Sequence, residues 1–303
     1  MTYLVTGATG NLARQLIERL LSDGHRVVGL DLRAPADHAG VEFIQVDITD
    51  TDAMETAVQR ARPDVVLHMA SLLSSSSEAD PSRAWSVNAD ASVALLESCR
   101  RVGVSRFFYP STGATYGGPL PDTLPEDFPQ WPQNVYGVTK VAVERAGAYY
   151  AARHGLDFRS LRLPMVISRY APAAAVSAYA SHAFAAASRG EHFVFPVDPS
   201  VGISTIYVRD VVDGVFTLLA ADPDRLTRRV YNVHGFAATA EAMATEIARQ
   251  HPGFSYEFAP DPAVMTVLGP LPSVHVDDSA RRDWGWNPRY DLARTTSDML
   301  TQE

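Results

Sequence analysis

The first half of the chain alternates short apolar runs with longer amphipathic stretches. Short runs bounded by turn residues indicate buried strands, and an apolar period of about 3.6 residues indicates helices. The predicted strands are 3–6, 26–30, 42–45, 65–68, 106–109 and 158–162, and the predicted helices are 11–23, 51–61, 81–102 and 134–154. Such alternation predicts an α/β fold built on a doubly wound parallel sheet, with helices on both faces.

Two glycines separate the first predicted strand from the first predicted helix. Gly7 permits a tight turn, and Gly10 lets the backbone approach a pyrophosphate. The helix that starts at Asn11 and Leu12 would direct its N-terminal N–H groups at the phosphates. Ala13 takes the third glycine position of this motif and is small enough for close packing of helix on strand. An isolated pair of glycines also fits an ordinary turn, so the motif needs support from elsewhere.

The second predicted strand supplies that support, because it ends in Asp31, about 20 residues after the glycines, where an acidic residue takes the adenosine ribose hydroxyls. A carboxylate there would repel a 2′-phosphate, which favours NAD over NADP. Arg33 leaves a 2′-phosphate open as an alternative, and a strand-end cap is the other interpretation of Asp31. The ordered set of features favours a dinucleotide site.

Tyr136 and Lys140 lie four residues apart on a predicted helix, and therefore on one face of it. A phenol with a pKa of about 10 is a poor base at neutral pH. An ammonium one turn away favours the phenolate, so the pair can move protons to and from a hydroxyl or carbonyl. Taken alone, two such residues on a helix also fit a solvated surface.

Polar segments follow two further predicted strands. Ser74 opens a run of four serines that predicts a flexible loop where open sheets bind ligands, although a simple linker fits equally well. Ser111 and Thr112 follow the strand 106–109, where a hydroxyl would hold the reacting oxygen beside Tyr136. A Ser/Thr turn is the alternative for these two residues.

The net charge of −9 argues against a nucleic-acid partner. The single cysteine, Cys99, excludes an intrachain disulfide, and the nine histidines show no metal-binding spacing, so no metal site is predicted. With no apolar run of membrane-spanning length, we expect a cytoplasmic enzyme of a small molecule with no membrane partner.

The regular alternation loosens after about residue 164. The sequence predicts a dinucleotide-binding domain at 1–164 plus 203–225. It predicts a smaller α/β substrate-binding lobe at 165–202 plus 228–303.

These features together resemble the extended short-chain dehydrogenases/reductases of the NAD-dependent epimerase/dehydratase family. Asp47-Ile48 resembles that family's adenine-binding pair, and Val87-Asn88 resembles the start of its long central helix. Leu67-His68-Met69-Ala70-Ser71 resembles the loop that passes the cofactor. Trp284-Gly285-Trp286-Asn287-Pro288 resembles the family's C-terminal ending.

The resemblance implies a Rossmann-type sheet, NAD as cofactor and a homodimer. It implies that Thr112 is the catalytic hydroxyl, that Tyr136 transfers the proton, and that Lys140 binds the nicotinamide ribose and lowers the pKa of the tyrosine. The further residues that it places at the cofactor are Asp47, Ile48, Met69, Ala70, Ser71, Asn88, Leu163, Pro164 and Val166.

Two departures separate the chain from well-known subfamilies. Gly113 and Ala114 stand where dehydratases carry an Asp-Glu pair, and Ile203 stands where nucleotide-sugar enzymes carry a phosphate-binding arginine. Three stretches, 109–112, 136–142 and 157–168, resemble short-chain-type L-threonine 3-dehydrogenases.

The substrate segment differs from those dehydrogenases, because 171–179 lacks their glycine-rich, paired-threonine stretch and Met165 replaces a glycine. The predicted substrate residues are Ser74, Ser111, Thr112, Met165 and Tyr179. We expect an NAD-dependent dehydrogenase of a small polar alcohol or hydroxy acid. The alternatives are a nucleotide-sugar 4-epimerase and a non-catalytic dinucleotide sensor.

Overall fold

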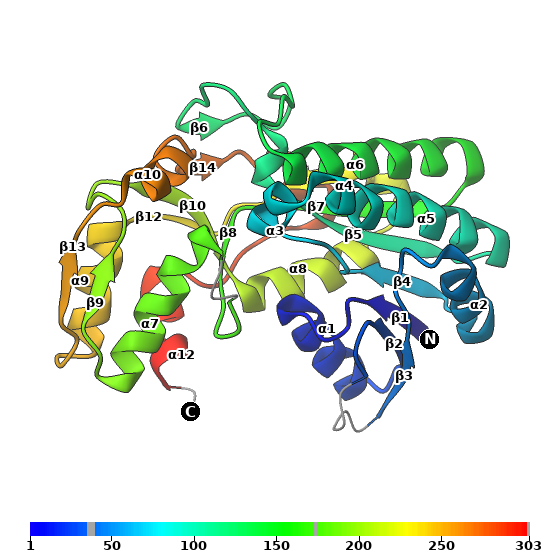
Figure 1. The fold of residues 1–303 in the computed structure, drawn as a ribbon, viewed down its shortest axis with the longest axis horizontal. Helices are drawn as coiled ribbons and strands as arrows, with labels where there is room; N and C mark the ends of the chain where they lie inside the picture. The colour runs from blue at the N-terminus through cyan, green and yellow to red at the C-terminus, as the bar shows by residue number, and fades with distance from the viewer. Residues whose placement is uncertain (35–39, 172–174, 302–303) are drawn as a thin grey trace. The chain divides into compact units, whose positions relative to one another are not determined.

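The computed structural model describes residues 1–34, 40–171 and 175–301 (Figure 1). The chain divides into two compact units. The first unit comprises Met1–Gly117, Gln130–Arg162 and Val215–Tyr231, and the second comprises Gly118–Pro129, Leu163–Gly214 and Asn232–Glu303. Whether these units are also the predicted cofactor-binding and substrate-binding domains stays a prediction.

The main sheet has seven strands in the order β11-β7-β5-β4-β1-β2-β3, which confirms the predicted doubly wound parallel sheet. Its strands are β1 Thr2–Thr6, β2 Arg26–Asp31, β3 Val41–Gln45, β4 Val65–His68, β5 Arg106–Thr112, β7 Asp157–Leu163 and β11 Val230–Asn232. The strand β11 was not predicted, because three residues are too few to show a period. The order reverses between β1 and β4, where folds of this kind bind ligands at the carboxyl ends of the strands.

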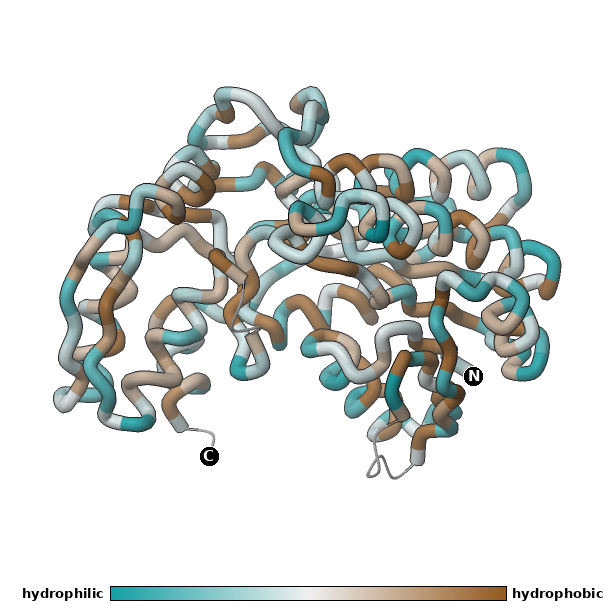
Figure 2. The backbone as a smooth tube through the Cα atoms, in the orientation of Figure 1, coloured by the Kyte–Doolittle hydropathy of each residue, from teal (hydrophilic) through white to brown (hydrophobic). Residues whose placement is uncertain are grey.

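Helices cover both faces of this sheet (Figure 1). The helices α2 Thr51–Ala61, α5 Ala91–Val102 and α6 Val135–His154 pack on one face through a cluster that includes Leu4, Met54, Leu96, Val143 and Phe158. The helix α1 Asn11–Ser22 lies on the other face (Figure 1). Brown segments in Figure 2 follow the central strands, where Leu4, Val66 and Phe107 are fully buried. These apolar strands fix the sheet as the core of the unit.

The predicted helix 81–102 consists of three joined pieces: α4 Pro81–Trp85, the π-helical stretch η1 Ser86–Asp90, and α5. Single π-helical turns occur often at functional sites. Asn88 lies in this one and is only 1% exposed.

The serine run is helical, so the predicted flexible loop is wrong: Ser74–Ala79 forms the short helix α3. Three hydrogen bonds to Leu72 order it. The Asn88 side chain bonds both Leu72 N (2.7 Å) and Leu72 O (3.0 Å), and the Ser77 hydroxyl donates to Leu72 O (3.2 Å). Serine is a weak helix former, so tertiary contacts decide the structure of this segment.

The second unit has a three-stranded sheet, β12-β10-β8, and two short two-stranded pairs, β13-β9 and β14-β6. Its strands are β6 Thr123–Leu124, β8 Met165–Ile167, β9 Phe193–Phe195, β10 Gly202–Tyr207, β12 Phe236–Thr239, β13 Tyr256–Phe258 and β14 Val274–His275. Its helices are α7 Tyr179–Arg189, α9 Ala240–Gln250, α10 Pro262–Leu268, α11 Asp278–Trp284 and α12 Leu292–Thr301. The helix α8 Val208–Ala220 starts in the second unit and ends in the first. Short 3-10 turns are η2 Gly113–Thr115, η3 Val176–Ala178 and η4 Pro223–Arg225.

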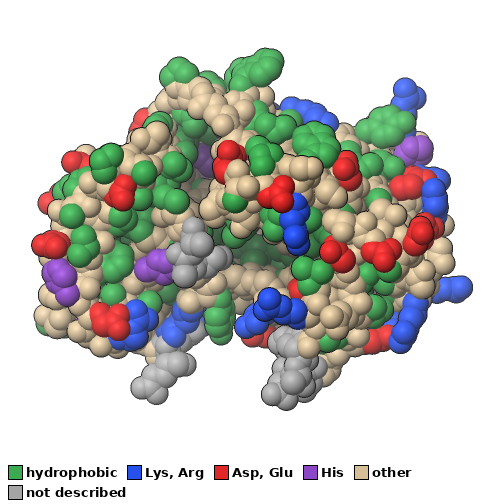
Figure 3. Space-filling model, viewed as in Figure 1, with side chains coloured by type: hydrophobic (Ala, Val, Ile, Leu, Met, Phe, Trp, Pro, Cys, Tyr) green, Lys and Arg blue, Asp and Glu red, His purple; other side chains and the backbone are tan. Residues whose placement is uncertain are grey.

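Within the described part of the chain, no helix combines the length and apolar character that a membrane span requires. On the face of the first unit that Figure 3 presents, acidic and basic side chains are interspersed.

Candidate active site

The turn between β1 and α1 lies against the loop that follows β4. Gly7 has φ +61°, and a Cβ there would stand 2.7 Å from both the Cα and the N of Ala70. Only glycine fits this conformation and this approach. The two segments follow the two strands at which the sheet order reverses, and α1 starts at Gly10 without a side-chain cap. The residues present therefore fit a dinucleotide whose phosphates rest on the start of α1.

Asp31 is tied to the same turn. Its Oδ2 accepts hydrogen bonds from the Thr9 backbone N (3.0 Å) and the Thr9 hydroxyl (2.9 Å). Among the described residues, only the Arg33 backbone N approaches Oδ1, at 3.4 Å, and the Arg33 side chain is exposed. The end of β2 and the glycine turn are thus held as one surface with a carboxylate oxygen at its rim. Thr9 was not predicted as a site residue from the sequence. Its position as a hydroxyl residue between Gly7 and Gly10 was the sequence feature that could have indicated this role.

A buried polar chain supports the loop after β4. His68 bonds the Thr6 hydroxyl through Nδ1 (2.6 Å) and the Ser92 hydroxyl through Nε2 (2.7 Å), and Ala70 N donates to Thr6 Oγ1 (3.2 Å). Burial lowers the pKa of His68 to about 3, with the Lys140 charge acting in the same direction, so the ring is neutral. The sequence pointed to a strand-end histidine but not to this role.

The side-chain amide of Asn88 makes hydrogen bonds to other groups of the protein. Its Oδ1 accepts from Leu72 N and from the Ser71 hydroxyl (3.2 Å), and its Nδ2 donates to Leu72 O and to the Thr139 hydroxyl (3.3 Å). Asn88 therefore positions Ser71 and Leu72 and joins them to α6. Direct contact of Asn88 with a cofactor stays a prediction.

Thr112, Tyr136 and Lys140 all belong to the first unit, Thr112 at the end of β5 and the other two in the first half of α6. Asn134 caps α6 by accepting from Gly137 N (2.7 Å). The Lys140 Nζ donates to Pro110 O (2.8 Å) and lies 5.4 Å from the centre of the Tyr136 ring and 4.3 Å from that of Tyr109.

The charge states of this pair differ from the expectation drawn from spacing. Burial raises the pKa of Tyr136 above its ordinary value of 10.0. Burial also lowers the pKa of Lys140 to about 7, while the Glu144 carboxylate opposes that shift. Desolvation acts on both groups against their charged forms. In the chain alone, burial therefore disfavours a phenolate at Tyr136 in spite of the neighbouring lysine.

The remaining predicted residues fall into two groups. In the first unit, Ser111 is buried, Ile48 is buried, and Asp47 is exposed with its carboxylate bonded to Thr49 N (2.9 Å). Ser74 is exposed at the start of α3, and Met69 is partly buried. In the second unit, Leu163, Met165 and Tyr179 are buried, Pro164 and Val166 are partly buried, and Pro172 to Ala174 lie outside the described residues.

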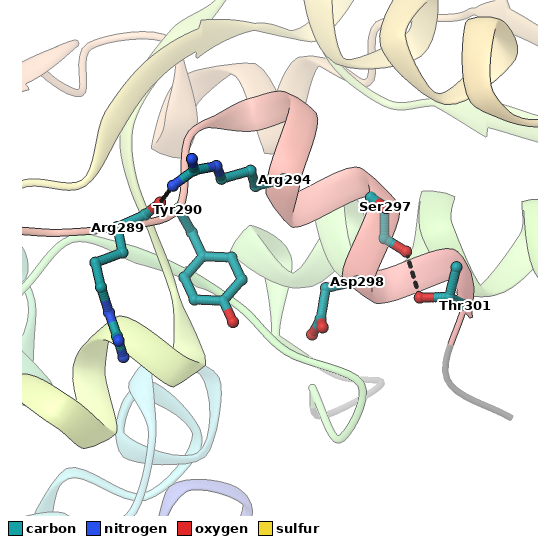
Figure 4. Close-up of a pocket in the computed structure, with 6 residues that line it drawn as sticks. All are labelled: Arg289, Tyr290, Arg294, Ser297, Asp298 and Thr301. Carbon is teal, nitrogen blue, oxygen red and sulfur yellow. Dashed lines mark hydrogen bonds between the residues drawn. The ribbon is translucent and has the colours of Figure 1, made fainter.

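The second unit also contains a cavity of about 410 Å³ between α12 and the segment before it. Figure 4 shows Arg289, Tyr290, Arg294, Ser297, Asp298 and Thr301 around it. Asp298 binds Arg209 (3.0 Å) and the Tyr207 hydroxyl (2.5 Å), and Arg289 binds Asp213. Asp298 and Arg289 thus each have a partner of opposite charge within the unit, and no residue predicted from the sequence lies at this cavity.

Comparison with known proteins points to one family. The model of the NAD dependent epimerase/dehydratase family matches residues 3–233. An uncharacterized epimerase/dehydratase of Staphylococcus haemolyticus is 33% identical, over 98% of this chain and 96% of its own length.

Two solved structures share the fold along nearly the whole chain. The holo form of an L-threonine dehydrogenase from Cupriavidus necator has a TM-score of 0.94 at 31% identity and covers 99% of each chain. A nucleoside-diphosphate-sugar epimerase from Agrobacterium tumefaciens has a TM-score of 0.89 at 25% identity and covers 98% of this chain and 92% of its own.

The family match spans both the turn at the strand-order reversal and the helix of Tyr136 and Lys140. The chain is therefore a member of the NAD-dependent epimerase/dehydratase family of extended short-chain dehydrogenases/reductases, which use a nicotinamide dinucleotide.

Proposed function

We propose that this protein is an NAD-dependent dehydrogenase of a small polar alcohol or hydroxy acid, similar in reaction to L-threonine 3-dehydrogenase. The observation that carries the proposal is the arrangement of Thr112, Tyr136 and Lys140 in one unit. The end of β5 supplies the hydroxyl, and one face of α6 supplies the phenol and the amine. The likeness to L-threonine dehydrogenases over 99% of the chain supports it.

The proposed reaction removes a hydride and a proton from one carbinol group. The nicotinamide of bound NAD⁺ supplies the hydride acceptor at its C4. Tyr136, as the phenolate, takes the hydroxyl proton onto its oxygen, and the Thr112 hydroxyl donates a hydrogen bond that holds the reacting oxygen. Lys140 anchors the nicotinamide ribose and adds positive charge beside the phenol.

The raised pKa of Tyr136 gives the cofactor a second role in this proposal. Lys140 alone does not hold the phenolate in the chain, and burial disfavours charge on both groups. With NAD⁺ bound, the phenol of Tyr136 would meet an additional positive charge, which would favour its ionised form. Binding of the oxidised cofactor would then favour the competent base.

Asp31 is the basis for NAD rather than NADP in this proposal. Its carboxylate is fixed by Thr9 at the rim of the glycine turn. A 2′-phosphate there would meet a like charge, which costs several kcal/mol in a desolvated contact.

A nucleotide-sugar 4-epimerase is the second candidate, because the Agrobacterium epimerase shares the fold over 98% of this chain. Against it stands Ile203 on β10, which is 3% exposed and cannot bind a diphosphate. A buried aliphatic side chain leaves that charge without a donor.

A screen of NAD⁺ reduction separates these candidates. Small hydroxy acids, β-hydroxy amino acids and free sugars would be supplied with NAD⁺ or NADP⁺, and NADH or NADPH formation followed by absorbance. We expect turnover with a small hydroxy compound and NAD⁺. Tight calorimetric binding of a UDP- or dTDP-sugar without net NADH formation would support the epimerase. A protein that binds NAD but turns over none of these compounds would support a dinucleotide sensor. In that case, Tyr136→Phe would bind NAD as the unaltered protein does.

A further inference from the structure

One buried carboxylate in the first unit has no part in the reaction proposed above. Glu144 lies on α6 one turn after Lys140 and is fully buried. Buried acidic side chains are rare unless they are paired. Its partner is Arg162 at the end of β7, which is 7% exposed.

Four donors satisfy the two oxygens of Glu144. Oε1 accepts from Arg162 Nε (2.9 Å) and the Ser111 hydroxyl (2.5 Å), and Oε2 accepts from Arg162 Nη2 (2.7 Å) and Gln130 Nε2 (3.0 Å). Hydrogen bonds to Glu144 raise the pKa of Arg162 although its burial acts to lower it, so the guanidinium stays charged. The positive charge of Arg162 therefore persists inside the protein.

The ion pair extends to the loop that follows β5. Arg162 Nη1 donates to the Tyr116 hydroxyl (2.7 Å), and its guanidinium carbon lies 5.2 Å from the centre of that ring. Ser111 directly precedes Thr112, and Tyr116 ends the η2 turn that follows it. The two charged side chains thus hold this segment at both ends.

Three residues on one face of α6, each about one turn from the next, contact the segment Pro110–Tyr116. A Cβ at Gly137 would stand 2.1 Å from Ala114 O, Lys140 donates to Pro110 O, and Glu144 accepts from Ser111. Positions 137, 140 and 144 share a helix face. The Thr112 hydroxyl, which accepts from Ala114 N (3.2 Å), lies between these fixed points.

We propose that Glu144 and Arg162 are positioning residues for the dehydrogenase reaction: they set the segment Pro110–Tyr116 against α6 and place a fixed negative charge beside Lys140. This inference rests on the proposed function for its catalytic meaning. Neither side chain touches the reacting atoms in the proposed mechanism.

The groups that face Lys140 come from four elements. They are Tyr136 and Glu144 on α6, Tyr109 on β5, His68 on β4 and, through Glu144, Arg162 on β7. His68 is neutral and the two tyrosines have raised pKa values, so Glu144 is the negative charge that opposes loss of the lysine proton.

The sequence makes this charge directly measurable, because Lys140 is the only lysine in the chain. Full-length protein labelled with ¹³C at the lysine ε-carbon gives one lysine signal, and its shift against pH reports the midpoint of Lys140. In Glu144→Gln we expect that midpoint to fall by roughly one pH unit or more, the scale on which a neighbouring charge acts. Glu97→Gln is the matched control, because Glu97 accepts from Arg100 and Arg101 on α5 and should leave the midpoint unchanged.

Ser111→Ala tests the hold on the loop without removing either charge. We expect its Lys140 midpoint and its affinity for NAD⁺ to match the unaltered protein, and kcat to fall by roughly ten- to a hundredfold, as small misplacements of reacting groups do. If Glu144→Gln does not fold, the Ser111→Ala variant still tests whether Glu144 positions the loop.

An unchanged midpoint in folded Glu144→Gln, or an unchanged kcat in Ser111→Ala, would overturn the inference. If the unaltered protein reduces no NAD⁺ with any substrate, the proposed function fails. The lysine midpoint then still decides whether Glu144 sets the charge of Lys140.

Discussion

At the scale of single residues, the site depends on charges that burial makes costly. Lys140 is 2% exposed, His68 is fully buried, and the Tyr136 pKa is raised, so each ionised form needs a specific partner. The types and spacing of Tyr136 and Lys140 were readable from the sequence. Their charge states were not, because desolvation depends on what the fold places around them.

The Lys140 pKa of about 7 predicts a pH dependence of stability. Between about pH 7 and 10.5 the unfolded chain binds a proton at this lysine that the folded chain does not. Folding stability should therefore rise with pH through this window. We expect the free energy of unfolding by urea, measured against pH, to rise more steeply for the unaltered protein than for Lys140→Met. Equal slopes for the two proteins would contradict a lowered pKa of Lys140 in the folded chain.

Asp31 predicts the cofactor preference. In Asp31→Asn the amide oxygen can still accept from Thr9, whereas the negative charge is lost. We expect the ratio of kcat/KM for NAD⁺ to that for NADP⁺ to fall by roughly tenfold or more, since a like-charge contact costs several kcal/mol. Glu18→Gln, on the exposed side of α1, also removes a negative charge and is a control whose ratio should not change. A clear NADP⁺ preference in the unaltered protein would refute this interpretation of Asp31.

At the scale of elements, the sequence predicted long, strongly patterned pieces and missed short ones. Strands such as 65–68 and helices such as 51–61 match the structure, because their apolar faces are complete within a few residues. The helix α3 was missed, since its order comes from Asn88 and Leu72 rather than from its serines. Glu144 and Arg162 were also missed, although a charged residue inside Leu161-Arg162-Leu163 was a visible signal.

The close approach of α6 to the η2 turn gives a test at this scale. A methyl group at Gly137 would stand 2.1 Å from the Ala114 carbonyl oxygen. This oxygen belongs to the backbone, which cannot move aside as easily as a flexible side chain. We expect Gly137→Ala to lower the free energy of unfolding by about 1–3 kcal/mol, the usual cost of overpacking. Val138→Ala, at the exposed next position, should change it by no more than about 0.5 kcal/mol. Chemical denaturation measures both, and equal effects would show that the approach is not tight.

For the whole molecule, the doubly wound parallel sheet and the family could be predicted from the sequence, and both are confirmed. They follow from alternating elements and from motifs whose spacing the fold dictates. The substrate could not be predicted, because specificity depends on side chains such as Met165 and Tyr179, whose packing the pattern does not encode. The named relatives in sequence are uncharacterized, so the substrate must come from experiment.

Cofactor binding should stabilise the whole chain. A ligand that binds only the folded state adds about 2.7 kcal/mol at a concentration of 100 times its Kd. We expect NAD⁺ to raise the midpoint of thermal unfolding, and NADP⁺ at the same concentration to raise it less. Equal midpoints with and without NAD⁺ would count against a dinucleotide site at Gly7 and Gly10.

The proposed reaction requires Tyr136 to exchange the proton during hydride transfer. The most direct measurement is single-turnover NADH formation by Tyr136→Phe on the substrate identified in the screen, beside NADH binding followed by fluorescence. We predict a rate lower by roughly 10²–10⁴, the usual loss when a general base is removed, with binding of the dinucleotide retained. A Tyr136→Phe variant that forms NADH at the rate of the unaltered protein would show that Tyr136 is not the proton-transfer residue.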